Sequence, residues 1–175
     1  MRKLKIYLDT SVINFLLADD ALEYKTVTEE FFNNYLDKYE VFISEIVYVE
    51  INRTKNEERK QQLLKALKKY RLEVYDTLNN EIESLANSYI ESGIVPQNKL
   101  DDALHIAFGV YYDFDILLSW NFKHISNIKK QVQINALNKT LGYFKDLNLF
   151  NPMEVKYECA EEAYWFLPVQ VWSGQ

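Results

Sequence analysis

Cysteine, glycine and proline are scarce in this chain of 175 residues, which has one Cys, four Gly and three Pro. A single cysteine, Cys159, excludes a disulfide framework and a zinc site built from thiolates, and a reducing cytoplasm is the simplest setting for it. The two histidines, His105 and His124, disfavour a His-rich metal site. Few glycines and prolines, together with 48% hydrophobic residues, exclude a disordered or collagen-like chain.

Long apolar runs are also missing. The basic start, Met1–Lys5, resembles the beginning of a signal peptide, but Asp9 and Asn14 interrupt the apolar residues that follow. The next apolar stretch, Ile106–Trp120, contains Asp113 and is too short to span a bilayer. We therefore expect a cytoplasmic protein with no membrane partner.

The net charge of −6 argues against a tight, non-specific nucleic-acid binder, but the charge is unevenly distributed. Residues 53–71 carry eight basic and two acidic side chains, with apolar residues at helical spacing. Two interpretations stay open for this predicted amphipathic helix. Its cations form an ordinary solvated face, or they steer RNA phosphate through Lys60, Lys65, Lys68 or Lys69.

Strand and helix patterns alternate along the chain, which predicts an α/β fold with a parallel sheet covered by helices. We expect Thr10 or Ser11 to cap the first helix and Ser44 to cap the helix after the second strand. Functional sites in such sheets lie outside the carboxyl ends of the strands. The predicted strands are 3–8, 41–44, 72–75 and 115–119, with a last one near Met153–Tyr157, and the predicted helices are 12–17, 24–39, 45–53, 53–71, 79–91 and 99–111.

Acidic side chains fall where this layout places a site. Asp9 directly follows the first strand, Glu50 lies on the helix after the second, and Asp102 opens the helix before the central strand at 115–119. Clustered carboxylates repel one another unless a cation or proton neutralises them, and oxygen ligands favour Mg²⁺ or Mn²⁺. Each acid also has a structural explanation: Asp9 can cap a helix, Glu50 can pair with Arg53, and Asp102 can complement a helix dipole.

Four segments of the chain stand out, in this order: Lys5–Ile13, Val41–Ser44 followed by Glu50-Ile51, Asp102–Ala107 and Leu117–Phe122. Together they resemble the four motifs of the PIN domain. The similarity extends over about residues 3–145 and is greatest to the VapC-type toxins of bacterial toxin–antitoxin pairs. It implies a PIN-like three-layer α/β/α fold with a central, mostly parallel sheet. We expect a nuclease domain at residues 1–150 and a C-terminal extension, 151–175, packed on the same domain.

The resemblance implies a Mg²⁺- or Mn²⁺-dependent ribonuclease that is inhibited by a partner antitoxin. Asp9, Glu50 and Asp102 match the family's metal-binding acids. Asn121 falls where the family often has a fourth acid, and Ser119 where a Ser or Thr commonly supports that position. The amide of Asn121 can coordinate a cation through its carbonyl oxygen but brings no charge. This departure puts the occupancy of a second metal in doubt.

Neighbouring residues compete for these roles. Glu45 lies five positions before Glu50, so the two cannot share a helical face, and Glu45 has the stronger dipole-capping explanation. Asp101 is expected at the rim of the site. His105 lies three residues after Asp102, and we expect it to be a packed histidine bonded to a neighbour rather than a general base.

Other functions stay open. A PIN-like fold that acts as a catalytically weak or inactive RNA-binding or protein-interaction module is the main alternative, and Asn121 motivates it. A phosphatase with an aspartyl nucleophile ranks lower, because that chemistry usually shows a second Asp where this chain has Ser11. The aromatic tail, residues 157–175, either covers the core or forms a homodimer face or an antitoxin groove.

Overall fold

The computed structural model describes residues 2–75 and 78–155 of the chain. Their core is a sheet of five parallel strands in the order β3-β2-β1-β4-β5. The first strand lies in the middle, with Tyr7 opposite Phe42 on one neighbour and Leu117 on the other. The strands are β1 (Lys5–Leu8), β2 (Glu40–Ser44), β3 (Glu73–Tyr75), β4 (Ile116–Leu118) and β5 (Asn148–Phe150).

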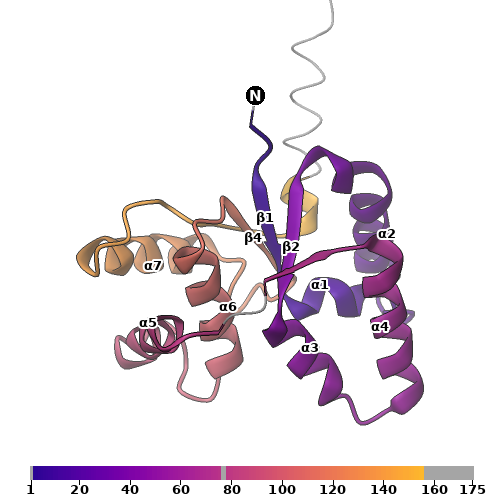
Figure 1. The fold of residues 1–175 in the computed structure, drawn as a ribbon, viewed down its shortest axis with the longest axis horizontal. Helices are drawn as coiled ribbons and strands as arrows, with labels where there is room; N and C mark the ends of the chain where they lie inside the picture. The colour runs from indigo at the N-terminus through magenta and orange to yellow at the C-terminus, as the bar shows by residue number, and fades with distance from the viewer. Residues whose placement is uncertain (1, 76–77, 156–175) are drawn as a thin grey trace, which may run out of the picture.

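Helices cover both faces of this sheet, which confirms the three-layer α/β/α arrangement (Figure 1). Alternate residues of β1 serve the two faces: Tyr7 packs in the cluster with α5, α6 and α7, and Ile6 and Leu8 pack in the cluster with α1, α2 and α4. The helices are α1 (Thr10–Phe15), α2 (Leu22–Glu30), α3 (Glu45–Asn52), α4 (Glu57–Tyr70), α5 (Asn80–Glu91), α6 (Leu100–Tyr111) and α7 (Ile128–Thr140). The predicted helix over 24–39 is α2 continued by a π turn, Phe31–Tyr35, and a 3₁₀ turn, Leu36–Lys38.

The predicted cap of α1 is wrong, and the predicted cap of α3 is confirmed in position but lacks a side-chain capping bond. Asp9, rather than Thr10 or Ser11, is the N-cap of α1, and its side chain accepts a hydrogen bond from the Val12 amide. Ser44 is the N-cap residue of α3, but its side chain makes no capping bond. Both differences have the same cause: the hydroxyls are engaged in tertiary hydrogen bonds around the site described below.

The last strand is also misplaced in the sequence prediction. The strand lies earlier, at Asn148–Phe150, and residues 152–155 form a helical turn. Asn151 accepts a hydrogen bond from the Met153 amide, and Glu154 reaches back to the Asn151 amide at 2.7 Å. With Pro152 at the first helical position, this is a capping box, a local signal that starts a helix.

The beginning of the C-terminal extension packs on the sheet, since the Val155 side chain is fully buried with Ile6 and Leu8. Residues 156–175, which include the aromatic tail, lie outside the described residues. The division into a domain at 1–150 and an extension at 151–175 therefore stays a prediction. Among residues 2–75 and 78–155, no helix is both long enough and apolar enough to cross a bilayer.

Candidate functional site

Three acids from distant parts of the chain line one pocket at the carboxyl edge of the sheet. Asp9 follows β1, Glu50 lies in the second turn of α3, and Asp102 lies in the first turn of α6. The pocket has a volume of about 280 Å³. Its lining consists of Asp9, Thr10, Ser11, Asn14, Glu50, Asp102, His105 and Asn121.

Asp9 is the most deeply buried of the three acids, with 3% of its surface exposed. Its Oδ1 accepts hydrogen bonds from the Ser11 hydroxyl at 2.5 Å and the Val12 amide at 3.2 Å. The Ser119 hydroxyl donates to Oδ2 at 2.5 Å. Burial raises the pKa of Asp9, and the nearby His105 and these donors offset only part of that rise. A cation in the pocket would favour the ionised carboxylate.

Ser119 and Ser11 link Asp9 to the loop that follows β4. The buried Ser119 hydroxyl accepts a hydrogen bond from the Asn121 amide at 2.9 Å, and Ser11 accepts one from the Trp120 amide at 2.8 Å. Ser119 thus contacts Asp9 directly, although it does not line the pocket. Ser11 was not among the predicted site residues. Its position two residues after a strand-end Asp was the available signal.

Glu50 is held by two side chains from other elements. His105 Nε2 lies 2.8 Å from Glu50 Oε2, and the Thr10 hydroxyl donates to the same oxygen. Burial alone would raise the pKa of Glu50, but the hydrogen bond and charge of His105 lower it below its ordinary value. Glu45 is exposed and does not line the pocket.

Asp102 and Asn121 face each other across the pocket wall. The Asn121 side-chain amide donates to Asp102 Oδ1 at 3.1 Å, and its own carbonyl oxygen accepts from the His124 amide at 3.1 Å. Asp102 Oδ2 is buried and accepts no hydrogen bond from the described residues. Burial raises the pKa of Asp102. Asp101 points elsewhere and forms an exposed ion pair of 2.7 Å with Arg53.

His105 is 2% exposed and bonded at both ring nitrogens. Its Nδ1 lies 2.6 Å from the Tyr7 hydroxyl, which in turn lies 2.6 Å from the Ser44 hydroxyl. The expectation of a packed histidine bonded to a neighbour is confirmed. Burial alone would lower the pKa of His105, but the hydrogen bond and charge of Glu50 raise it overall. Tyr7 was predicted only as a strand residue, and nothing in its local sequence marks its hydroxyl.

The donor chemistry of the pocket fits a hard divalent cation. Three carboxylates share one pocket, and Asp102 Oδ2 is a buried oxygen without a partner. In the described part of the chain, however, no three His, Cys, Asp or Glu side chains converge as a ready ligand set. Protein donors hold Asp9 and Glu50 in their present positions. The assignment of Asp9, Glu50, Asp102 and Asn121 as metal ligands stays a proposal.

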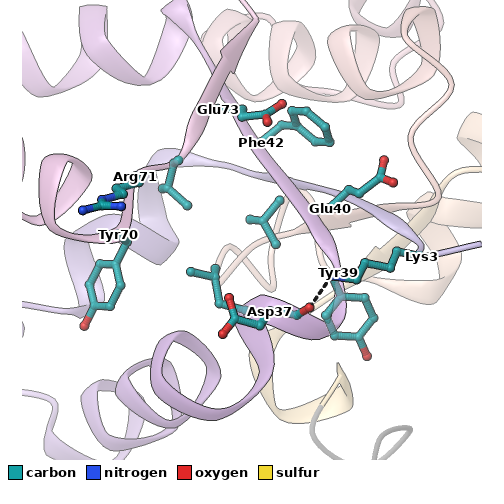
Figure 2. A pocket seen from close by; sticks show the side chains of 11 residues that line it. Lys3, Asp37, Tyr39, Glu40, Phe42, Tyr70, Arg71 and Glu73 are labelled. Carbon is teal, nitrogen blue, oxygen red and sulfur yellow. Dashed lines mark hydrogen bonds between the residues drawn. The ribbon is translucent and has the colours of Figure 1, made fainter.

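A larger pocket, of about 610 Å³, lies at the opposite edge of the sheet, where β2 and β3 begin (Figure 2). Figure 2 shows side chains of both charges around it, including Lys3, Arg71, Glu40 and Glu73. The Lys3 ammonium donates to the Asp37 carbonyl oxygen at 2.5 Å. The larger pocket mixes carboxylates with cations, whereas the smaller pocket gathers three carboxylates. We therefore place the candidate site in the smaller pocket.

The basic helix α4 does not line the acidic pocket. Lys60 pairs with Glu57 at 2.5 Å, and Lys65 and Lys69 line a separate hollow of about 550 Å³ between α1, α2 and α4. Arg59 donates to the Asn14 carbonyl oxygen at 3.3 Å, which ties α4 to a residue of the acidic pocket. A role of these lysines in RNA binding stays a prediction.

Comparisons with known proteins agree with this fold. A family model described as PIN domain matches residues 6–127. The fold is similar to that of the crystal structure of VapBC2 from Rickettsia felis bound to a DNA fragment from their promoter. That match has a TM-score of 0.53 and 20% sequence identity, and it covers 85% of this chain and 98% of the other. No curated protein matches the chain.

Proposed function

We propose, from the premise that this chain belongs to the PIN domain family, that it is a Mg²⁺- or Mn²⁺-dependent endoribonuclease. We further propose that it is the toxin of a toxin–antitoxin pair. The observation that carries the proposal is that Asp9, Glu50 and Asp102 line one pocket at the carboxyl edge of the parallel sheet. This is the edge at which ligands bind in sheets of this kind.

The residues divide the work of holding a cation and a substrate. Asp9, Glu50 and Asp102 would hold the cation, with Asn121 beside Asp102. Ser11 and Ser119 fix the Asp9 carboxylate from both sides. When bound, a divalent cation polarises a phosphodiester and makes water a stronger nucleophile at neutral pH. The Lys99 side chain stands close enough to Asp102 to lower its pKa, and it offers positive charge to RNA phosphate at the rim.

The partner proposal has separate support. The fold is similar to that of VapBC2, and the sequence motifs resemble VapC-type toxins. An antitoxin that binds this protein would have to cover the acidic pocket or the route by which RNA enters it. A homodimer is the second proposed assembly. Co-expression with the neighbouring open reading frame, followed by purification of the complex, tests the proposed antitoxin complex.

The test of the enzyme proposal compares two adjacent acids in the same helix. We expect Mn²⁺ at about 100 times its Kd to raise the Tm by roughly 5–10 °C. Asp9→Asn and Asp102→Asn should abolish both this shift and the cleavage of single-stranded RNA. Asp101→Asn is the matched control, because Asp101 pairs with Arg53 outside the pocket, and it should keep both. Full cleavage by the Asp9→Asn protein would refute the assignment.

A non-catalytic RNA-binding or protein-interaction module is the second candidate. Two observations favour it: Asn121 is neutral, and its amide already donates to Asp102. The same metal titration separates the candidates. A folded protein that binds RNA with no metal-dependent shift and no turnover would be such a module.

A further inference from the structure

A line of buried hydrogen bonds runs from the protein core to the acidic pocket. It begins at Ser44, passes through the Tyr7 hydroxyl and the His105 ring, and ends at Glu50, with successive distances of 2.6, 2.6 and 2.8 Å. Ser44, Tyr7 and His105 are 1%, 0% and 2% exposed. The Glu50 side chain is 24% exposed, so the line leads out of the dry interior to the pocket.

The protons along this line can be arranged without leaving any group unsatisfied. An ionised carboxylate only accepts, so His105 Nε2 carries a proton toward Glu50. If the ring is neutral, Nδ1 accepts from Tyr7, and Tyr7 accepts from Ser44. If the ring is charged, Nδ1 donates to Tyr7, and Tyr7 donates to Ser44. The Tyr7 hydroxyl therefore fixes the orientation of the His105 ring in either state.

Packing alone does not explain the hydroxyl of Tyr7. Its ring packs against Phe108 and Phe114, with centroid distances of 4.9 and 5.5 Å, and a phenylalanine would fill the same volume. Burying a hydroxyl costs free energy unless it is hydrogen-bonded. Here the Tyr7 hydroxyl is hydrogen-bonded to Ser44 and to His105, and His105 in turn is bonded to Glu50.

The line also joins the three segments that carry the acids. Tyr7 lies two residues before Asp9, Ser44 lies on β2 just before α3, which carries Glu50, and His105 lies one turn after Asp102. Both donors to Glu50, Thr10 and His105, act on the same carboxylate oxygen, Oε2. A glutamate has three side-chain torsions, and holding one oxygen removes most of that freedom.

We propose that Tyr7 and His105 are positioning residues for the Glu50 carboxylate, with Tyr7 acting through His105. The inference rests on the proposed function, because it requires that the pocket binds a divalent cation. Groups that orient a metal ligand from behind typically contribute a factor of roughly 10 to 100 in metal affinity. Neither residue needs to touch the cation or the substrate.

The test uses two buried tyrosines as a matched pair. Tyr89 is fully buried like Tyr7, and its hydroxyl donates to Asn138 Oδ1 at 2.6 Å. Neither Tyr89 nor Asn138 lines the acidic pocket. Tyr7→Phe and Tyr89→Phe each remove one buried hydroxyl and keep the ring. Mn²⁺ affinity is measured by titration calorimetry, and thermal unfolding is measured without metal.

We expect both variants to lower the Tm without metal by similar amounts. Only Tyr7→Phe should weaken Mn²⁺ binding, by roughly 10-fold. His105→Gln, which can still donate toward Glu50, should retain more of the Mn²⁺ affinity than His105→Leu. An unchanged Mn²⁺ affinity in Tyr7→Phe overturns the inference and leaves the proposed function intact. Failure of the wild-type protein to bind Mn²⁺ overturns both.

Discussion

The side-chain amide of Asn121 donates a hydrogen bond of 3.1 Å to Oδ1 of Asp102. A neutral donor therefore stands where the resemblance to VapC-type toxins leads one to expect a fourth acid. This contact satisfies one oxygen of a carboxylate whose pKa is raised by burial, and it leaves the other oxygen, Oδ2, without a partner. In the absence of a cation, Asp102 beside Asn121 is therefore more stable than two neighbouring carboxylates would be.

Replacing this amide by an acid should make the fold depend more strongly on metal. In Asn121→Asp, a donor becomes a like charge beside Asp102, and we expect the metal-free protein to lose about 1–3 kcal/mol of unfolding free energy at pH 7. Mn²⁺ should then raise the Tm by more than in the wild-type protein. Thermal unfolding with and without Mn²⁺ measures both effects. Asn80→Asp, an exposed site in α5, is the control for added charge, and an equal Mn²⁺ response in all three proteins would contradict the prediction.

Removal of the Ser119 hydroxyl should lower both the stability of the fold and the Mn²⁺ affinity of the site. Ser119 is fully buried. Its hydroxyl donates to Asp9 Oδ2 and accepts a hydrogen bond from the backbone amide of Asn121. Ser119→Ala therefore costs about 1–3 kcal/mol of unfolding free energy. It also raises the pKa of Asp9 further, because the hydroxyl stabilises the ionised form, so Mn²⁺ affinity at neutral pH should fall. Ser88→Ala, which removes an exposed hydroxyl in α5, should change neither quantity in urea unfolding and Mn²⁺ titration.

Asp115 links stability to acid pH at the amino edge of β4. Burial alone would raise its pKa, but Lys145 at 2.8 Å, the Lys5 amide at 2.8 Å and Arg2 at 2.9 Å lower it below the ordinary value. A carboxyl whose pKa is lower in the folded state stabilises the fold above its unfolded pKa of about 3.9. That contribution disappears as the pH falls through the folded pKa.

Asp115→Asn should accordingly lose about 1–3 kcal/mol of unfolding free energy at pH 7. The difference from the wild-type protein should shrink as the pH falls below about 4. Denaturant unfolding at several pH values measures this. Asp146→Asn breaks an exposed pair with Lys139 and should cost at most about 1 kcal/mol. A difference between wild type and Asp115→Asn that stays constant down to low pH would exclude the charge as its cause.

Arg71 offers a stabilising substitution. It ends α4 in the left-handed conformation, with φ 50° and ψ 42°, which a glycine adopts without steric cost. We expect Arg71→Gly to raise the unfolding free energy by about 0.5–1 kcal/mol, partly offset by the greater freedom of glycine in the unfolded chain. Arg71→Ala keeps the strain and should bring no gain. The urea midpoints of the two variants decide between these outcomes.

The sheet and the site region could largely be predicted from the sequence. The strands β1, β2 and β4 are short apolar runs that are buried on both faces, as parallel sheets require. Asp9 and Glu50 follow β1 and β2, and Asp102 opens the helix before β4. These acids were expected at one edge, and all three do line one pocket there. A parallel topology is enough to predict this grouping, because it brings the carboxyl ends of all strands to the same edge of the sheet.

Other features depend on tertiary contacts that local patterns do not record. Helix α7 was not predicted, because Ile128 and Val132 are 78% and 63% exposed while Ile134 is buried, so its apolar residues do not form one stripe. The Asp9 carboxylate, rather than a hydroxyl, caps α1, because the Ser11 hydroxyl bonds to the loop after β4. The link from Tyr7 to His105 joins residues 98 positions apart, and no spacing rule reaches that far.

The central place of β1 has a consequence for the order of events during synthesis. Its second neighbour, β4, and the loop that positions Asp9 through Ser119 lie about 110 residues downstream. A nascent chain that has exposed only its first hundred residues holds two of the acids but none of the loop that orients them. Folding must wait for this long-range closure, which is slow in parallel sheets. A competent pocket can therefore form only after the loop at Ser119 and Asn121 has emerged from the ribosome.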